Sequence, residues 1–251
     1  MAVTASPGSP VSSPRAGARA LVGTALRTWL RYAVPLTVLS AIAFSPLAIL
    51  ARQLRPPTTF AEAVATQATG WAMVSVAWLS QLVLVGGAAA MTGPPRTQLA
   101  ALGAGSLRLL GAIVPCLAAA AAIALGSLAF VLPGVVLLAL LALTGASPAR
   151  GLPDALRDSI AVARTRLPMM IAVVVGMLAL DALIGLVSYF AVLMPVVKPA
   201  TPAQIAATRT FVRVVVVALI ALSPLPATLL ATLRRQAEPS SASEAANPGS
   251  G

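Results

Sequence analysis

Long apolar stretches recur along this chain and constrain its fold more than any other feature. A membrane-spanning helix needs about 20 consecutive, mainly apolar residues to cross a hydrocarbon core about 30 Å thick. Stretches of this kind, separated by short polar, proline-rich or arginine-containing segments, lie at about residues 32–51, 70–91, 109–127, 128–143, 168–194 and 208–233. The sequence therefore predicts an all-α fold, a polytopic transmembrane helix bundle of about six spans.

The composition agrees with lipid as the solvent for most of the chain. Hydrophobic residues make up 59% of the 251 residues and charged residues only 9%, whereas a soluble domain carries about 25% charged residues. The net charge of +11 raises the question of nucleic acid, but the basic residues are scattered and aromatic residues make up only 4%. Nucleic-acid binding needs such residues to cluster. We therefore expect no nucleic-acid partner, and we assign the charge to cytoplasmic loops and anionic lipid head groups.

Residue types that usually carry catalysis are scarce in this sequence. The chain has no histidine and a single cysteine, Cys116, which lies inside an apolar stretch. Histidine is the commonest metal ligand and acid–base group. The sequence therefore predicts no catalytic residue, no metal and no cofactor.

The distribution of basic residues predicts the orientation in the membrane. Residues 1–28 and 236–251 are rich in small and polar residues and are predicted to be disordered tails on either side of a transmembrane domain over residues 29–235. With six spans and the N-terminus inside, twelve of the 17 basic residues fall in inside segments and five in outside loops. Because cytoplasmic loops carry an excess of lysine and arginine, both termini are predicted to be cytoplasmic.

The connector over residues 147–167 has a helical apolar repeat of its own. Apolar residues recur there at intervals of three or four, at Leu152, Leu156, Ile160, Ala163 and Leu167. This spacing indicates an amphipathic helix. We expect it to lie on the cytoplasmic membrane surface, with a soluble connecting helix as the alternative.

Prolines predict interruptions in two of the spans. Pro133 and Gly134 lie near the start of the span 128–143, and Pro224 and Pro226 lie within the span 208–233. Proline lacks an N–H group and clashes with the carbonyl four residues earlier, so it kinks or breaks a helix. We expect a tight hairpin between residues 109–127 and 128–143, and a broken last span.

Asp181 is an acidic residue in the middle of a predicted span. A carboxylate at the bilayer centre costs at least about 2.5–3.5 kcal/mol, so it should face the bundle, pair with another group or be protonated. Its expected hydrogen-bond donors are Ser75, Ser80, Gln81 or Ser188. Asp181 is either a residue that links helices by a hydrogen bond or a proton- or cation-sensing group in a transport path. The first interpretation is favoured, because transporters usually carry more than one intramembrane charge.

Three stretches carry a resemblance to a known family: Leu-Pro-Gly-Val at 132–135, GLPDALRDS at 151–159 and PATLLATLRR at 226–235. Together they resemble a large bacterial family of six-span proteins related to the membrane domain of glycerophosphoryl diester phosphodiesterase, over a little more than half of the chain. This chain has Ala231 where the family often has tyrosine. The resemblance implies an architecture in the bacterial inner membrane. It implies no activity, because the phosphodiesterase chemistry belongs to a separate soluble domain.

These observations favour a non-enzymatic integral membrane protein of the bacterial cytoplasmic (inner) membrane. We expect a scaffold or a lipid- or protein-interaction module, with the lipid bilayer, anionic lipid head groups and a further membrane protein as its partners. The alternative is a small transporter or lipid translocator that uses Asp181.

Overall fold

A computed structural model describes residues 14–52, 60–94, 96–129, 131–148, 151–188 and 202–237, which contain helices and short turns and no strand. In chain order the helices are α1 (Pro14–Arg31), α2 (Ala33–Ala51), α3 (Phe60–Ala89), α4 (Gln98–Ala129), α5 (Val131–Leu141), α6 (Leu152–Thr165), α7 (Leu167–Ser188), α8 (Pro202–Leu222) and α9 (Pro224–Ala237). A short 3₁₀ turn, η1 (Thr144–Ala146), follows α5. The predicted all-α class is confirmed for these residues.

Five segments of the described chain are long and apolar enough to cross a membrane: Ala33–Ala51, Ala68–Ala89, Gln98–Ser127, Leu167–Ile184 and Arg209–Ala237. Large apolar side chains remain on their outer faces; Val114 and Leu125 of α4, for example, are 66% and 69% exposed. Apolar surface of this extent is suited to lipid rather than water. The protein is therefore a multi-pass membrane protein. The sixth predicted span, at residues 128–143, corresponds to a shorter apolar helix over Pro133–Ala146, so five helices rather than six have the length to cross.

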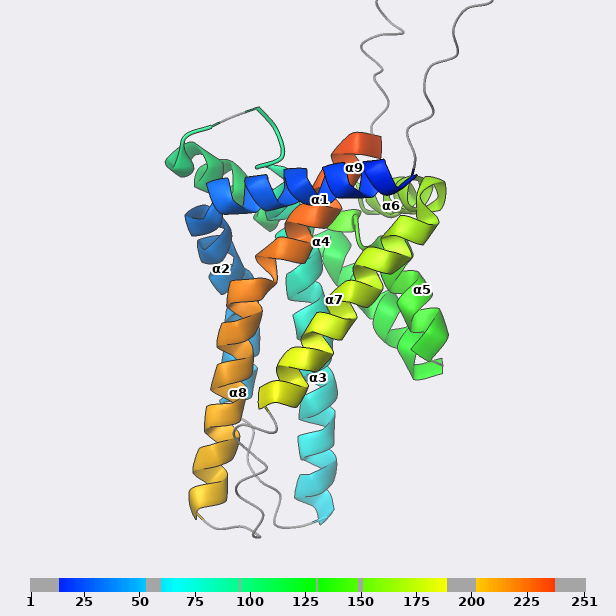
Figure 1. Cartoon of the computed structure of the whole chain (residues 1–251). Coiled ribbons are helices and arrows are strands. Elements are labelled where there is room, and N and C mark those ends of the chain that lie inside the picture. Colours follow the sequence, from blue (N-terminus) through cyan, green and yellow to red (C-terminus); the bar gives the residue numbers. More distant parts are fainter. Residues whose placement is uncertain are drawn as a thin grey trace, which may run out of the picture.

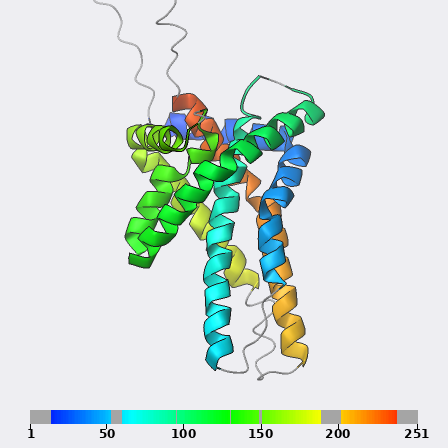
Figure 2. The ribbon, with the colours of Figure 1, turned by 180° about the vertical axis from the view of Figure 1, so that it is seen from behind.

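The helices divide into a bundle and a cap at one end (Figure 1). α2, α3 and α8 run along the long axis, whereas α1 and α6 lie across the end at which α9 finishes. We call this the terminal end, because the described chain both begins and finishes there, with α1 packed on α9. From behind, the hairpin of α4 and α5 descends obliquely from the terminal end, and its tip lies well short of the lower ends of α3 and α8 (Figure 2).

The predicted tight hairpin of α4 and α5 is confirmed, and small residues make it possible. A Cβ atom on Gly134 would collide with Ser127, and one on Gly126 would lie 2.5 Å from a methyl group of Leu137. In the described residues α4 extends to Ala129 and α5 begins at Val131, so Pro133 and Gly134 lie within α5. These two residues therefore do not break a helix; Pro133 lies in the first turn of α5, where a missing N–H group costs little.

A second close approach joins α3 to η1. A Cβ atom on Gly86 would lie 2.5 Å from the carbonyl oxygen of Gly145, and one on Gly145 would collide with the carbonyl oxygen of Leu82. Small residues serve this purpose in membrane proteins, where close packing replaces the hydrophobic drive for helix association. The contact brings the turn after α5 against the end of α3, beside the site described below.

Prolines remove backbone hydrogen bonds in α2 and between α8 and α9, and in α2 a side chain replaces the lost bond. Pro46 cannot donate to the carbonyl of Ile42 four residues earlier, and the Ser45 hydroxyl donates to that oxygen instead at 2.8 Å. The predicted break in the last span is confirmed, because α8 ends at Leu222 and α9 begins at Pro224. The carbonyl of Ser223, at the break, accepts a hydrogen bond from Gln81 Nε2 at 3.3 Å. Pro226 lies in the first turn of α9.

The prediction of a disordered tail over residues 1–28 is wrong from Pro14 onward, where α1 begins. Leu21 and Ala25 are buried, whereas Val22, Leu26 and Leu30 are exposed as a second apolar stripe. This arrangement is typical of a helix that lies in the membrane interface. Residues 1–13 and 238–251 of the two predicted tails lie outside the described residues.

Candidate functional site

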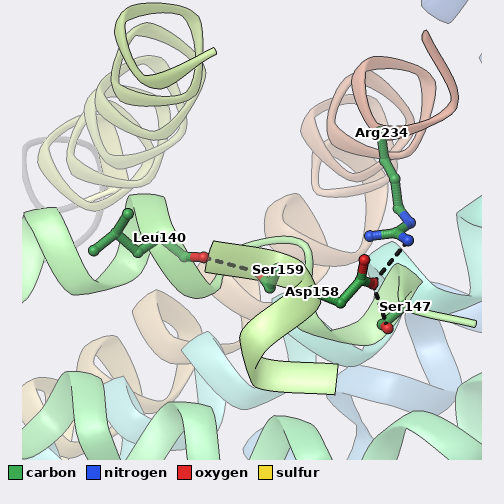
Figure 3. Close-up of polar contacts among 5 residues, drawn as sticks. All are labelled: Leu140, Ser147, Asp158, Ser159 and Arg234. Atoms are coloured by element: carbon green, nitrogen blue, oxygen red, sulfur yellow. Dashed lines mark hydrogen bonds and ion pairs between the residues drawn. The ribbon is translucent and has the colours of Figure 1, made fainter. Parts of the chain in front are cut away.

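The amphipathic connector predicted at residues 147–167 forms α6, and neighbouring polar residues attach it to the rest of the terminal end (Figure 3). The carboxylate of Asp158 accepts a hydrogen bond from Ser147 Oγ at 2.6 Å and pairs with Arg234 Nη2 of α9 at 2.8 Å. On the other side, Ser159 Oγ donates to the carbonyl of Leu140 at 2.8 Å. That carbonyl belongs to the last turn of α5 and has no partner within its own helix. Asp158 and Ser159 thus join α6 to three other segments.

The buried face of α6 is not the leucine-containing face that the sequence indicated. Ala155, Ser159 and Ala163 are the buried residues, whereas Leu152 is 38% exposed. Leu156 and Ile160 pack only partly against the core. Small side chains form the fully buried face of α6, which contacts α5 and η1, whereas Leu156 and Ile160 are only partly covered.

Two further contacts set the geometry of this end. Arg166, at the end of α6, donates from Nη2 to the carbonyl of Gln236 at 3.0 Å, near the C-terminus of α9, where a cation is favourable. The segment before α4 is held by Tyr32, whose hydroxyl accepts the N–H of Arg96 at 3.0 Å, and by Gln98, which donates to the carbonyl of Arg31 at 2.6 Å. The start of α4 is therefore attached to the junction of α1 and α2.

An arginine-lined cavity of about 190 Å³ lies between these elements. Its walls come from the end of α3, the loop after it, α4, η1 and α9, and consist of Ala89, Thr92, Gly93, Arg108, Ala146, Ala231, Arg234 and Arg235. A neighbouring cavity of about 290 Å³ shares Thr92 and Arg235 and is otherwise lined by Thr24, Thr28, Thr232 and Gln236. We call the first cavity the arginine cavity and the second the threonine cavity.

The arginine cavity is strongly electropositive. Arg234 is paired with Asp158, whereas Arg108 and Arg235 are exposed and form no ion pair within the described part of the chain. In the threonine cavity the hydroxyls of Thr28, Thr92 and Thr232 donate to backbone carbonyls three or four residues earlier in the chain. Their oxygens can therefore accept hydrogen bonds from a ligand. The two cavities together offer guanidinium donors to an anion and hydroxyl oxygens to a neighbouring donor group.

Asp181 does not belong to this site. It lies on α7, half-buried, and no hydrogen bond or ion pair connects it to another residue of the described ranges. Two of its expected donors bond elsewhere: Ser80 Oγ donates to the carbonyl of Ala43 at 2.7 Å, and Gln81 donates to Ser223. The expectation for the Ser188 side chain lies outside the described residues.

Sequence reasoning missed the arginine cavity because its residues come from distant segments. From the sequence alone, Arg108, Arg234 and Arg235 were predicted only to be basic residues of cytoplasmic segments. Asp158 was predicted only to belong to the connector helix. One signal was present: Asp158 and Arg234 lie in two of the three stretches that carry the family resemblance, and the structure brings those two stretches into contact. The described residues contain no group of three side chains suited to a metal ion.

No model of a known protein family, no curated protein and no solved structure matches this chain.

Proposed function

We propose that this protein is a non-enzymatic module of the bacterial inner membrane that binds the phosphate of anionic lipid head groups at its terminal end and presents that end to the cytoplasm. One observation carries the proposal: Arg108, Arg234 and Arg235 line a single cavity in a cap of interfacial helices. Guanidinium groups form paired hydrogen bonds with phosphate oxygens and are the usual residues for phosphate recognition.

The position of the cavity favours a lipid over a soluble anion. α1, which crosses the same end, keeps Val22, Leu26 and Leu30 exposed as an apolar stripe, and such a helix lies at the level of the head groups. A phosphate held at this level belongs to a lipid whose chains enter the bilayer beside the bundle. The neighbouring threonine oxygens favour an anionic head group that carries hydroxyl donors, such as glycerol.

The charge of the terminal end supports a cytoplasmic orientation for that end. Arginines of α1, α4, α6 and α9 gather there, among them Arg19, Arg27, Arg31, Arg108, Arg157, Arg164, Arg166, Arg234 and Arg235. The opposite end of the described chain holds Arg52, Arg209 and Arg213. Basic residues are retained on the cytoplasmic side, where anionic lipids attract each of them by about 1 kcal/mol. The family resemblance supports the same membrane.

Native mass spectrometry tests the proposal on full-length protein released from nanodiscs of phosphatidylcholine with a minor fraction of phosphatidylglycerol. The test variant is Arg108→Gln/Arg235→Gln. The matched control is Arg157→Gln/Arg164→Gln, because these two arginines are exposed on α6 at the same end and line neither cavity. At about 1 kcal/mol for each arginine, the test variant should bind phosphatidylglycerol about thirtyfold more weakly than the wild type.

The control separates a site from general surface charge. Equal loss of phosphatidylglycerol in both variants would mean that only the summed charge of the terminal end attracts lipid. Full retention by the Arg108→Gln/Arg235→Gln variant would contradict the proposal. A stoichiometric protein that copurifies with the wild type and is lost when residues 152–165 are scrambled would identify α6 as the surface for a protein partner.

A further inference from the structure

A groove at the opposite end of the molecule has the lining of an amphiphile site. It lies between α2 and α8, has a volume of about 510 Å³, and is the largest of the cavities described here. Its polar residues are Arg52, Arg209 and Arg213, and its apolar residues are Ala48, Ala51, Val212, Val216, Val217 and Ile220. No residue is shared with the arginine or threonine cavity, so the inference below is independent of the proposed function.

The three arginines lie together at one end of the groove. Arg209 and Arg213 are four residues apart on α8 and therefore project from the same face of that helix. Arg52 directly follows the last residue of α2, on the other wall. All three are exposed, and the described residues that line the groove include no acidic side chain. The rim therefore carries concentrated positive charge that nothing in the described lining neutralises.

The apolar wall runs away from this charge toward the centre of the bundle. Val212 and Val216 are each 6% exposed and Ile220 is partly buried, so they form the floor of the groove. Arg209 is the first residue of the apolar segment Arg209–Ala237, which places the arginines at the edge of the hydrocarbon. From Arg209 to Ile220 the helix rises about 16 Å. This depth is about half of a hydrocarbon core about 30 Å thick, which is the depth of one leaflet.

We propose that this groove binds one anionic phospholipid of the leaflet opposite the terminal end. The phosphate lies among Arg52, Arg209 and Arg213, and an acyl chain lies along Val212, Val216 and Ile220. Charge at the interface and apolar surface of one leaflet's depth fit no other occupant as well. Inorganic phosphate would leave the apolar wall unused, and an uncharged lipid would leave three arginines without an anion.

Lipid retention is measured in the Arg108→Gln/Arg235→Gln background, so that lipid held at the terminal end does not contribute. Full-length protein from nanodiscs of phosphatidylcholine and phosphatidylglycerol is compared with two further variants by native mass spectrometry. Arg209→Gln/Arg213→Gln removes the charge, and Arg209→Lys/Arg213→Lys keeps it. We expect the glutamine variant to lose one bound phosphatidylglycerol, with affinity reduced more than about tenfold, and the lysine variant to retain part of it.

A second pair of variants tests the apolar wall without altering charge. Ala48→Leu narrows the groove, whereas Ala41→Leu adds the same side chain at an exposed position of α2 outside the groove. Only Ala48→Leu should release the lipid. Thermal unfolding of each variant shows whether it is folded. If the arginine variants are misfolded, the comparison of Ala48→Leu with Ala41→Leu tests the proposal alone.

Three outcomes would overturn the inference. The first is full retention of phosphatidylglycerol by the Arg209→Gln/Arg213→Gln variant. The second is loss of phosphatidylglycerol in the Arg209→Gln/Arg213→Gln variant but not in the Ala48→Leu variant. This result would mean that the arginines attract the lipid by charge alone and that the apolar wall does not bind it. The third is displacement of the lipid by inorganic phosphate. None of these outcomes depends on whether the arginine cavity binds lipid, because Arg108 and Arg235 are already replaced in every protein that is compared.

Discussion

The ion pair between Asp158 and Arg234 is the clearest point at which this structure can be perturbed. It joins α6 to α9, and the same carboxylate accepts the hydroxyl of Ser147. Asp158→Asn removes the charge but keeps the size of the side chain and one carbonyl oxygen. The substitution therefore tests the electrostatic part of the contact without opening a cavity.

The expected magnitude follows from the exposure of the two partners. The Arg234 side chain is 5% exposed and the Asp158 side chain 33%, so water screens the pair from one side only. Breaking a fully buried pair costs about 3–5 kcal/mol, and a hydrogen bond to a charged group contributes about 1.5–3 kcal/mol. Because one oxygen of the amide can still accept a bond, we expect Asp158→Asn to lower the free energy of unfolding by about 2 kcal/mol. This corresponds to about thirtyfold in the unfolding equilibrium.

The free energy of unfolding is measured in mixed micelles to which sodium dodecyl sulfate is added. Tryptophan fluorescence follows the unfolding. Asp154→Asn is the matched control, since Asp154 is exposed one turn earlier on α6 and its removal costs only a helix-dipole interaction of about 0.3–1 kcal/mol. A double-mutant cycle with Arg234→Met then isolates the pairwise energy. Equal losses in Asp158→Asn and Asp154→Asn, or a coupling energy near zero, would refute the reasoning.

Two further substitutions test packing and the intramembrane carboxylate. Gly86→Ala should lower the free energy of unfolding by about 1–3 kcal/mol, because its Cβ atom would lie 2.5 Å from the carbonyl oxygen of Gly145. The control Gly103→Ala has nothing within 4 Å of its Cβ atom and should be neutral or stabilising in the same assay. Equal losses of stability in the two variants would contradict the close approach of α3 and η1. Asp181→Asn should leave thermal stability and lipid retention unchanged or improved, because no described residue bonds to Asp181 and a neutral amide enters lipid at lower cost. A clear loss of stability would favour the interpretation in which Asp181 links helices by a hydrogen bond, and loss of a bound ion would favour the transport interpretation.

The sequence was sufficient where a single segment determines the structure. Apolar length alone predicted most of the spans, proline chemistry predicted the break between α8 and α9, and apolar spacing predicted α6 as a helix. Each of these features depends on residues close together in the chain. Even there the finer result differed, because the face that α6 buries depends on how closely its neighbours approach. Small residues such as Ala155 and Ser159 occupy the buried face of α6, although leucines define the apolar repeat in the sequence.

Features that depend on distant partners were not predictable. α1 contains too few large apolar residues to indicate a helix, and it is stabilised by its contact with α9. The hairpin within residues 109–143 was predicted, but not the close approach of Gly126, Ser127 and Gly134, which meet only after the hairpin has formed. The arginine cavity combines residues more than a hundred positions apart, so no local pattern marks it.

The ion pair also controls the charge that the arginine cavity presents to a ligand. Arg234 lines this cavity and is held by Asp158, so the carboxylate both fixes the guanidinium and cancels one of the three positive charges. A purely structural pair would affect only stability. If the cavity binds lipid phosphate, Asp158→Asn should have opposite effects on two quantities: the free energy of unfolding should fall, and retention of phosphatidylglycerol should rise. A fall in both would mean that the position of Arg234, rather than its charge, governs binding, and that the cap must be intact before any anion can enter.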